Sequence, residues 1–163
     1  MNIREFLYTG FYSGYSPVAP GTAGTLVAMA IYILINFLFE GIDPEIFQLG
    51  YFVFVMAAIF PSVRLGDYAE KNCKVKDPQH VVIDEIIGYW ISLLFVPFSI
   101  SAALLAFVLF RIFDIVKPFP ANQLQSLSGG LGIVIDDVIA GFYACVLMHI
   151  VVYFFDYYNI LLP

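Results

Sequence analysis

The sequence has few charged residues and few cysteines. Charged side chains make up 12% of its 163 residues, whereas a soluble domain has about 25%, so the chain lacks the polar surface that a soluble globular protein needs. Two cysteines are too few for a disulfide framework or a cysteine-based zinc cluster. Basic residues are scarce as well, with 7 against 13 acidic ones, and the net charge of −6 argues against a protein that binds nucleic acid through a basic face.

Apolar residues are abundant instead. They make up 61% of the chain, and aromatic residues make up 18%, which excludes an intrinsically disordered protein. The length suits one domain that covers residues 1–163. Three uncharged runs of 18 residues are long enough to cross a bilayer as helices. The sequence therefore predicts an all-α fold, a polytopic membrane helix bundle.

The longest uncharged stretch, residues 86–110, is compatible with two structures. It forms either one tilted helix of 25 residues or parts of two spans that fold back near Pro97, because proline interrupts helical hydrogen bonding. We favour two spans, which brings the total to about five. The predicted elements are an N-terminal interfacial helix at residues 1–11 and spans at residues 22–39, 46–63, 81–98, 101–116 and 138–155.

The basic residues decide between these alternatives. With five alternating spans, all seven basic residues lie on one side of the membrane, which is cytoplasmic by the positive-inside rule. Four spans would place Arg111 and Lys117 opposite the basic stretch of residues 64–76. The five-span topology puts the N-terminus inside and the C-terminus outside. Asp67 and Glu70 then fall in a loop, where we expect solvated charges; the alternative is that they join the site.

Two pairs of acidic residues are predicted to lie at the same membrane depth. Asp84 and Glu85 open the third span, Asp136 and Asp137 precede the fifth, and each pair precedes a glycine by about one helical turn. Small residues at these places let neighbouring helices approach closely. Four carboxylates near one plane suit Mg²⁺, a hard cation that prefers oxygen ligands. The same residues also fit a pathway for protons or cations.

Basic residues follow at the end of the fourth span. Arg111, Asp114 and Lys117 are spaced so that they share one helix face. Two cations beside a carboxylate suit a phosphate group near a metal ion. The alternative is an intrahelical salt bridge with basic ends that reach toward the membrane surface.

The segment before the first span, residues 13–25, is rich in glycine and hydroxyl residues. Backbone N–H groups at a glycine-rich helix start favour anions, so this segment is a candidate for binding a phosphate-bearing head group. The simpler interpretation is a loop that ends in a helix N-cap at Thr22. The candidate binding residues are Ser16, Gly21, Thr22, Gly24 and Thr25.

Four motifs occur in an order that is typical of one family. They are Ser16-Pro17-x-Ala19-Pro20-Gly21-Thr22-x-Gly24-Thr25-Leu26, Asp84-Glu85-x-x-Gly88, Phe110-Arg111-x-Phe113-Asp114-x-x-Lys117-Pro118 and Gly129-Gly130-x-Gly132-Ile133-x-x-Asp136-Asp137-x-x-Ala140-Gly141. Together they resemble the phosphatidylglycerophosphatase A family. The resemblance implies a Mg²⁺-dependent phosphatase of the bacterial inner membrane that hydrolyses phosphatidylglycerophosphate at the cytoplasmic face. Its partner would be a phospholipid in the bilayer rather than a nucleic acid, and the oligomeric state is left open.

This hypothesis gives each charged residue a role. One or two Mg²⁺ ions are held by the four paired carboxylates, Asp84, Glu85, Asp136 and Asp137. The phosphoryl oxygens are bound by Arg111 and Lys117. Asp114 either completes the metal shell or acts as general base. A small cation or proton carrier that uses the same carboxylates is the alternative, and it requires a polar path to the far side.

Overall fold

The computed structural model describes residues 2–157, and every regular element in that range is helical. This confirms the predicted all-α class. The elements are α1 (Ile3–Tyr8), the 3₁₀ turn η1 (Ser13–Tyr15), α2 (Pro20–Leu38), α3 (Pro44–Cys73), α4 (Ile83–Ser92), α5 (Ile100–Val116), α6 (Ala121–Leu124) and α7 (Gly130–Tyr157). The predicted outside position of the C-terminus falls on residues 158–163, outside the described range.

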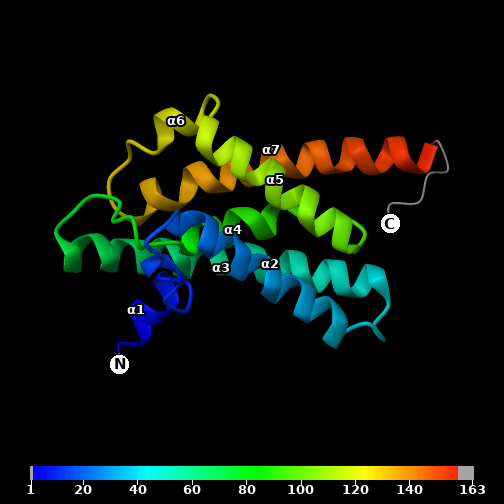
Figure 1. The fold of residues 1–163 in the computed structure, drawn as a ribbon, viewed down its shortest axis with the longest axis horizontal. Helices are drawn as coiled ribbons and strands as arrows, with labels where there is room; N and C mark the ends of the chain where they lie inside the picture. Colours follow the sequence, from blue (N-terminus) through cyan, green and yellow to red (C-terminus); the bar gives the residue numbers. More distant parts are fainter. Residues whose placement is uncertain (1, 158–163) are drawn as a thin grey trace.

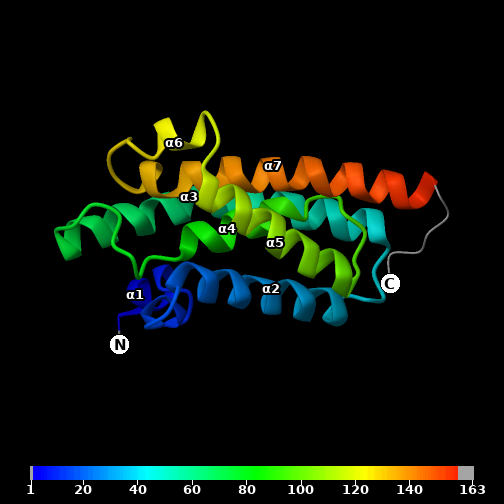
Figure 2. The same cartoon turned by 45° about the horizontal axis from the view of Figure 1, so that its top comes forward.

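The long helices form an elongated bundle with two distinct ends (Figure 1 and Figure 2). One end, at the left of Figure 1, carries α1, the last turns of α3, the short α6 and the first turns of α7. The other end carries the connection between α2 and α3 and the last turns of α7. Helix α4 lies in the middle and packs against α2, α3, α5 and α7. Most of its residues are therefore buried.

Three of the helices, α2, α3 and α7, are long and apolar enough to cross a membrane. They expose large apolar side chains such as Leu34, Phe60 and Phe142, as a surface in contact with lipid would. Helix α5 has 17 residues and α4 has only 10, which is about 15 Å at 1.5 Å per residue and half of a hydrocarbon core of about 30 Å. The membrane-type bundle is confirmed, but the count of about five spans is not.

The predicted third span, residues 81–98, is only partly helical. The helix ends at Ser92, residues 93–99 continue as irregular chain, and α5 begins at Ile100. The single long helix over residues 86–110 is therefore excluded, and the predicted fold-back near Pro97 is confirmed. The prediction was wrong in treating residues 93–98 as helix.

Helix α3 provides hydrogen-bond partners for this irregular segment. Gln48 Oε1 accepts a hydrogen bond from the backbone N–H of Phe95 at 3.2 Å, and Gln48 Nε2 donates to the carbonyl of Val96 at 3.0 Å. The Tyr51 hydroxyl donates to the carbonyl of Trp90 at 2.9 Å. Irregular backbone at membrane depth is tolerated where it is buried in protein, and here the neighbouring helix satisfies it.

Helix α3 itself is longer than predicted. We expected a span over residues 46–63 that ends near Pro61, but the helix passes through Pro61 and ends at Cys73. Asp67 therefore lies on a helix, and its Oδ1 accepts a hydrogen bond from the backbone N–H of Gly130 at 2.7 Å. The expectation that Asp67 is a solvated loop charge was wrong, because this side chain caps the first turn of α7.

The other predicted segments are each covered by a helix. Helix α2 begins two residues before the expected residue 22, α5 one residue before residue 101, and α7 eight residues before residue 138. Asp136 and Asp137 consequently lie in the second turn of α7. The predicted N-terminal helix over residues 1–11 is shorter, since α1 has six residues.

Candidate active site

Three of the predicted carboxylates form a cluster between α4 and α7. Asp84 and Glu85 lie in the first turn of α4, and Asp137 lies in the second turn of α7. One carboxylate oxygen of each residue lies within 4.8 Å of the others. Asp84 is 8% exposed and Asp137 is 3% exposed. The structure thus gathers three of the four predicted metal ligands in a buried place.

Two glycines explain why the carboxylates meet. A Cβ atom on Gly141 would lie 2.2 Å from the carbonyl oxygen of Gly88, and one on Gly88 would lie 2.7 Å from the carbonyl oxygen of Asp137. The backbones of α4 and α7 therefore touch at this crossing. Asp84 and Asp137 each precede their own glycine by one turn, so the contact brings their side chains together.

The carboxylate cluster fits a divalent cation. Asp84 Oδ1, Glu85 Oε2 and Asp137 Oδ2 are buried and have no hydrogen-bond partner among residues 2–157. A buried carboxylate is costly unless a cation or a donor balances it. A set of oxygen-only donors suits Mg²⁺ better than zinc or copper. The residues present therefore fit the metal that the motifs imply.

Two cations lie beside the carboxylate cluster, each paired with another acid. Arg111 Nη1 lies 2.6 Å from Asp114 Oδ2 and donates to Thr25 Oγ1 at 3.4 Å, while Lys117 forms an ion pair with Asp136. The salt bridge that we considered as an alternative role for Arg111 is thus present. Arg111 Nε is nevertheless buried without a partner in the described chain, so the guanidinium can still donate to a ligand.

Lys117 follows the last residue of α5. Burial acts to lower the pKa of its ammonium group, but the hydrogen bond from Lys117 to Asp136 and the negative charges of nearby aspartates outweigh burial and raise the pKa above its ordinary value. Lys117 therefore stays positively charged near neutral pH and can attract a phosphate.

These groups line one cavity of about 450 Å³ at the end of the bundle that carries α1 and α6. The predicted site residues in its wall are Gly21, Asp84, Glu85, Arg111, Asp114, Lys117 and Asp137. Gly21 lies at the start of α2, where a Cβ atom would be 2.2 Å from Glu85 Oε1. A larger residue at this position would force that carboxylate to move. The cavity therefore combines the carboxylate cluster with two cations.

Several predicted residues lie outside the cavity wall. Ser16 Oγ donates to the carbonyl of Val18, and Gly24 packs against Val82, whose Cβ would be 2.6 Å from an added Cβ atom. Thr25 contacts the site indirectly, since its hydroxyl donates to the carbonyl of Gly21 at 2.8 Å and accepts from Arg111. Thr22 does not cap α2, because the helix begins at Pro20 after Ala19, so that interpretation was wrong. Asp136 contacts the site through Lys117 rather than through the carboxylate cluster.

The cavity also contains residues that we did not single out. Asp77 and Gln79, from the connection between α3 and α4, line it together with Ala19 and Pro20. Asp77 has a positive φ of 48°. The sequence signal was weak, since Asp77 follows a lysine-rich stretch that is typical of a solvated loop.

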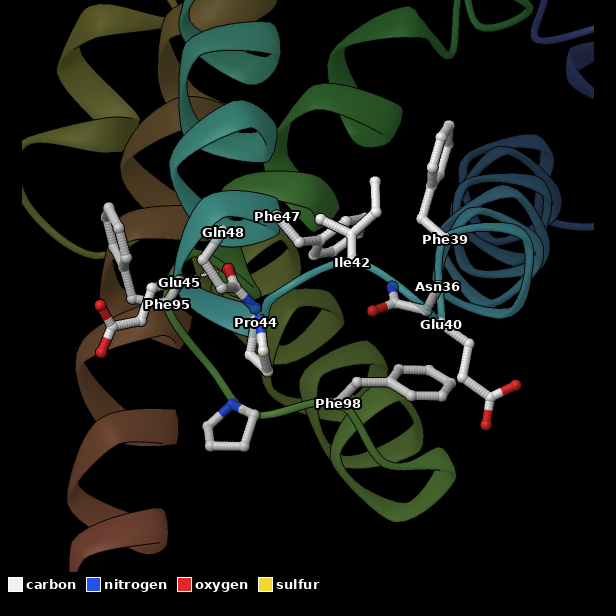
Figure 3. A pocket seen from close by; sticks show the side chains of 11 residues that line it. Asn36, Phe39, Glu40, Ile42, Pro44, Glu45, Phe47, Gln48, Phe95 and Phe98 are labelled. Atoms are coloured by element: carbon white, nitrogen blue, oxygen red, sulfur yellow. Dashed lines mark hydrogen bonds between the residues drawn. The ribbon is translucent and has the colours of Figure 1, made fainter.

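A second cavity lies at the opposite end of the bundle (Figure 3). It measures about 700 Å³ and lies between the α2–α3 connection and residues 95–98. Its wall is mainly apolar, and its charged residues, Glu40 and Glu45, are both acidic. Figure 3 shows these two side chains on opposite sides of the cavity. Without a lining cation, this cavity is poorly suited to phosphate.

The fold and the first cavity define a class of protein: a membrane-type helix bundle with clustered carboxylates and two cations in a cavity at one end. The chain belongs to the phosphatidylglycerophosphatase A family, whose model matches residues 6–152. This is the family expected from the four motifs, and it makes the protein a hydrolase of phosphoric monoesters.

Curated relatives cover most of the chain. A phosphatidylglycerophosphatase A of Escherichia coli K12 is 40% identical over 142 residues, 86% of this chain and 78% of the relative. The protein of that name from Haemophilus influenzae is 34% identical over 155 residues, 94% and 91% of the two chains. A Bacteroides thetaiotaomicron protein, named as a candidate phosphatidylinositol-3-phosphatase, is 41% identical over 145 residues, 86% and 87%. No solved structure matches the chain significantly.

Proposed function

We propose that this protein is a Mg²⁺-dependent phosphatidylglycerophosphate phosphatase. It hydrolyses the terminal phosphate monoester of the lipid and releases phosphatidylglycerol and phosphate. The observation that carries this proposal is the set of three buried, unpartnered carboxylate oxygens in the same cavity as Arg111 and Lys117. Family membership supports the substrate class, and the carboxylate cluster supports the metal.

In this proposal the cavity residues have two roles, which are to hold the metal ion and to bind the phosphoryl group. Asp84, Glu85 and Asp137 would hold Mg²⁺, which when bound supplies positive charge to the phosphoryl oxygens and acidifies water. Arg111 and Lys117 bind the phosphoryl oxygens and stabilise the charge that develops on them.

The two remaining acids orient these cations. Asp114 holds Arg111, and Asp136 holds Lys117. The sequence-based roles of Asp114 as general base and of Asp136 as metal ligand stay predictions.

We also place the cavity at the cytoplasmic face of the bacterial inner membrane. The half of the bundle that contains the cavity carries every basic residue of the sequence, namely Arg4, Arg64, Lys71, Lys74, Lys76, Arg111 and Lys117. The connection between α2 and α3, at the opposite end, carries only acidic charges. Positive residues gather on the cytoplasmic side of membrane proteins, which supports this orientation.

A phosphoinositide is the second candidate substrate. The relative that is 41% identical is named for phosphatidylinositol 3-phosphate, and this lipid also carries a phosphate monoester on its head group. The carboxylate cluster and the two cations would bind either phosphate, so the choice depends on whether the cavity rim accepts glycerol or the larger inositol ring.

A cation or proton carrier is not favoured. Beyond the acids, α4 continues with Tyr89, Trp90 and Ile91, which are buried in the main apolar core. The Tyr89 hydroxyl donates to the carbonyl of Ala103 and the Trp90 indole to that of Ala28. These polar groups are therefore used within the bundle and do not form a path toward the far end.

Phosphate release by the purified full-length protein tests the proposal. We would compare phosphatidylglycerophosphate with phosphatidylinositol 3-phosphate in the same detergent, with Mg²⁺ or with a chelator. We expect faster release from the first lipid and loss of activity on chelation, restored by Mg²⁺. Activity that persists after complete chelation would contradict the proposed dependence on Mg²⁺. Faster release from phosphatidylinositol 3-phosphate would indicate that the substrate is a phosphoinositide.

Variants of the carboxylate cluster locate the site. Asp84→Asn and Asp137→Asn should each lower turnover by more than ~10²-fold, because changes even to the partners of metal ligands cost ~10–100-fold. Asp156→Asn is the matched control, since Asp156 is exposed near the end of α7 and should behave like the wild type. Full activity in both cluster variants would contradict the assignment.

A further inference from the structure

The cavity contains a carboxylate that none of these roles uses. Asp84, Glu85 and Asp137 form the carboxylate cluster, and Asp114 is paired with Arg111. Asp77 also lines the cavity, but its carboxylate makes no hydrogen bond or ion pair with residues 2–157. Asp77 is exposed, whereas the carboxylate cluster is mostly buried, so Asp77 lies at the mouth of the cavity.

The chain holds Asp77 at the mouth by contacts on both sides. The backbone N–H of Asp77 donates to Glu70 Oε1 on α3 at 3.3 Å. The preceding Lys76 donates through Nζ to the carbonyl of Ser126 at 3.1 Å, and the following Pro78 is buried. The backbone of Asp77 has a positive φ, a conformation that aspartate and asparagine adopt more readily than most residues.

The geometry of phosphoryl transfer places the leaving oxygen near Asp77. In phosphoryl transfer the attacking and leaving oxygens lie on opposite sides of phosphorus. If attack starts from the buried carboxylate cluster, the leaving glycerol oxygen faces the mouth, which is also where the lipid must extend out of the cavity. An alcohol oxygen is a poor leaving group unless it receives a proton as the bond breaks.

We propose that Asp77 is the general acid that protonates the departing glycerol oxygen. This inference rests on the proposed function. A water oxygen forms a bond to phosphorus while the bond from phosphorus to the bridging glycerol oxygen breaks. The electron pair of that bond stays on the glycerol oxygen, which takes the proton of the Asp77 carboxyl group and becomes a hydroxyl. The attacking water passes a proton to Asp114, which then releases it to solvent, and Asp77 recovers its proton from solvent.

The surroundings of Asp77 support this role. Loss of water contacts in the cavity wall raises the pKa of its carboxyl group above the ordinary value for aspartate. Among the charged groups near it, Lys117 and Lys76 act to lower this pKa, and Glu70 and Asp114 act to raise it. Asp84 and Asp136 are also close enough to interact with its charge. The net shift keeps the acid protonated to a higher pH than an ordinary aspartate, as proton donation requires.

A substrate with a bridging sulfur tests the proposal. In this analogue of phosphatidylglycerophosphate, sulfur replaces the oxygen between glycerol and phosphorus, and the thiolate leaves without a proton. Asp77→Asn should lower kcat for the oxygen substrate by about 10²–10⁴-fold, the usual contribution of general acid–base catalysis. The same variant should hydrolyse the sulfur analogue at a rate close to that of the wild type. Asparagine tolerates positive φ, so the loop conformation is preserved.

The controls separate the possible failures. Asp156→Asn should match the wild type on both substrates. An equal loss on both substrates would make Asp77 a structural residue, and no loss on either would also overturn the proposal. Wild-type protein that does not hydrolyse phosphatidylglycerophosphate would contradict the proposed function instead.

The dependence of kcat on pH gives an independent readout. A general acid must be protonated, so activity falls as pH rises through its pKa. This fall should be present in the wild type and absent in Asp77→Asn with the oxygen substrate. An unchanged profile in the variant would contradict the role of Asp77.

Discussion

Replacement of Gly141 by alanine tests whether the contact between α4 and α7 positions the carboxylates of the proposed metal site. A Cβ atom at this place would lie 2.2 Å from the carbonyl oxygen of Gly88 and 3.1 Å from its Cα atom. Non-bonded heavy atoms prefer separations of about 3.5 Å, so the helices must move apart by about 1 Å. The obstructing atoms belong to the backbone, and no side-chain rotation can relieve the contact.

This displacement should reduce turnover more than it reduces stability. It shifts Asp137 relative to Asp84 and Glu85, and a misplacement of about 1 Å can cost ~10²-fold in rate. The overpacking itself costs about 1–3 kcal/mol of stability, and alanine returns up to about 1 kcal/mol through its higher helix propensity. We therefore expect Gly141→Ala to remain a folded bundle with ~10²-fold lower kcat.

The assay is phosphate release in detergent, combined with a thermal unfolding curve for each protein. Gly50→Ala is the matched control, because Gly50 lies on α3 and an added Cβ atom there would meet nothing within 4 Å. Gly50→Ala should keep wild-type turnover and equal or greater stability. Wild-type turnover in Gly141→Ala would refute the link between the helix contact and the site.

Substitutions at three other positions test separate contacts. Gln48→Leu removes the side-chain partners of Phe95 and Val96 and should lower the free energy of unfolding by about 1–3 kcal/mol; an unchanged unfolding curve would contradict it. Asp67→Ala removes the cap of α7 and should cost about 1 kcal/mol, with a smaller loss in Asp67→Asn, measured in the same way. Arg111→Lys keeps the charge but loses the planar fork, and should lower kcat by ~10²-fold while the unfolding curve stays the same; wild-type kcat would contradict this role for Arg111.

The carboxylate cluster could be predicted from the sequence because its signal is local. An acid pair, one helical turn and a glycine occur twice in the chain, and this repetition indicated two helices that carry acids at one depth and small residues for close packing. The structure adds that the two helices pack against each other at Gly88 and Gly141. Local spacing did not separate Asp136 from Asp137, because only the packing of Lys117 against Asp136 decides which of the two faces the carboxylate cluster.

Other features depend on contacts between distant segments. Asp67 caps a residue 63 positions further along the chain, and nothing near Asp67 in the sequence indicates that partner. Asp77 was overlooked for a related reason. Its neighbours in sequence are lysines and a proline, typical of a surface loop, while its neighbours in space are the cavity walls. A charge pattern indicates which end of a bundle a residue occupies, but not which cavity it lines.

The predicted third span, residues 81–98, shows the same limit. It also explains why the count of about five spans is not confirmed. Ten helical residues of α4 cover about 15 Å, and residues 93–99 continue from them as turns and irregular chain that line the cavity at the opposite end. Together they reach from the cavity to the opposite end without forming a helix that could span a membrane alone. A hydropathy pattern indicates how long this apolar stretch is, but it does not indicate how its backbone is hydrogen-bonded. That hydrogen bonding depends on Gln48 and Tyr51 from α3. Because α4 is short and surrounded by other helices, its first turn can hold two acids that a helix in contact with lipid would not tolerate.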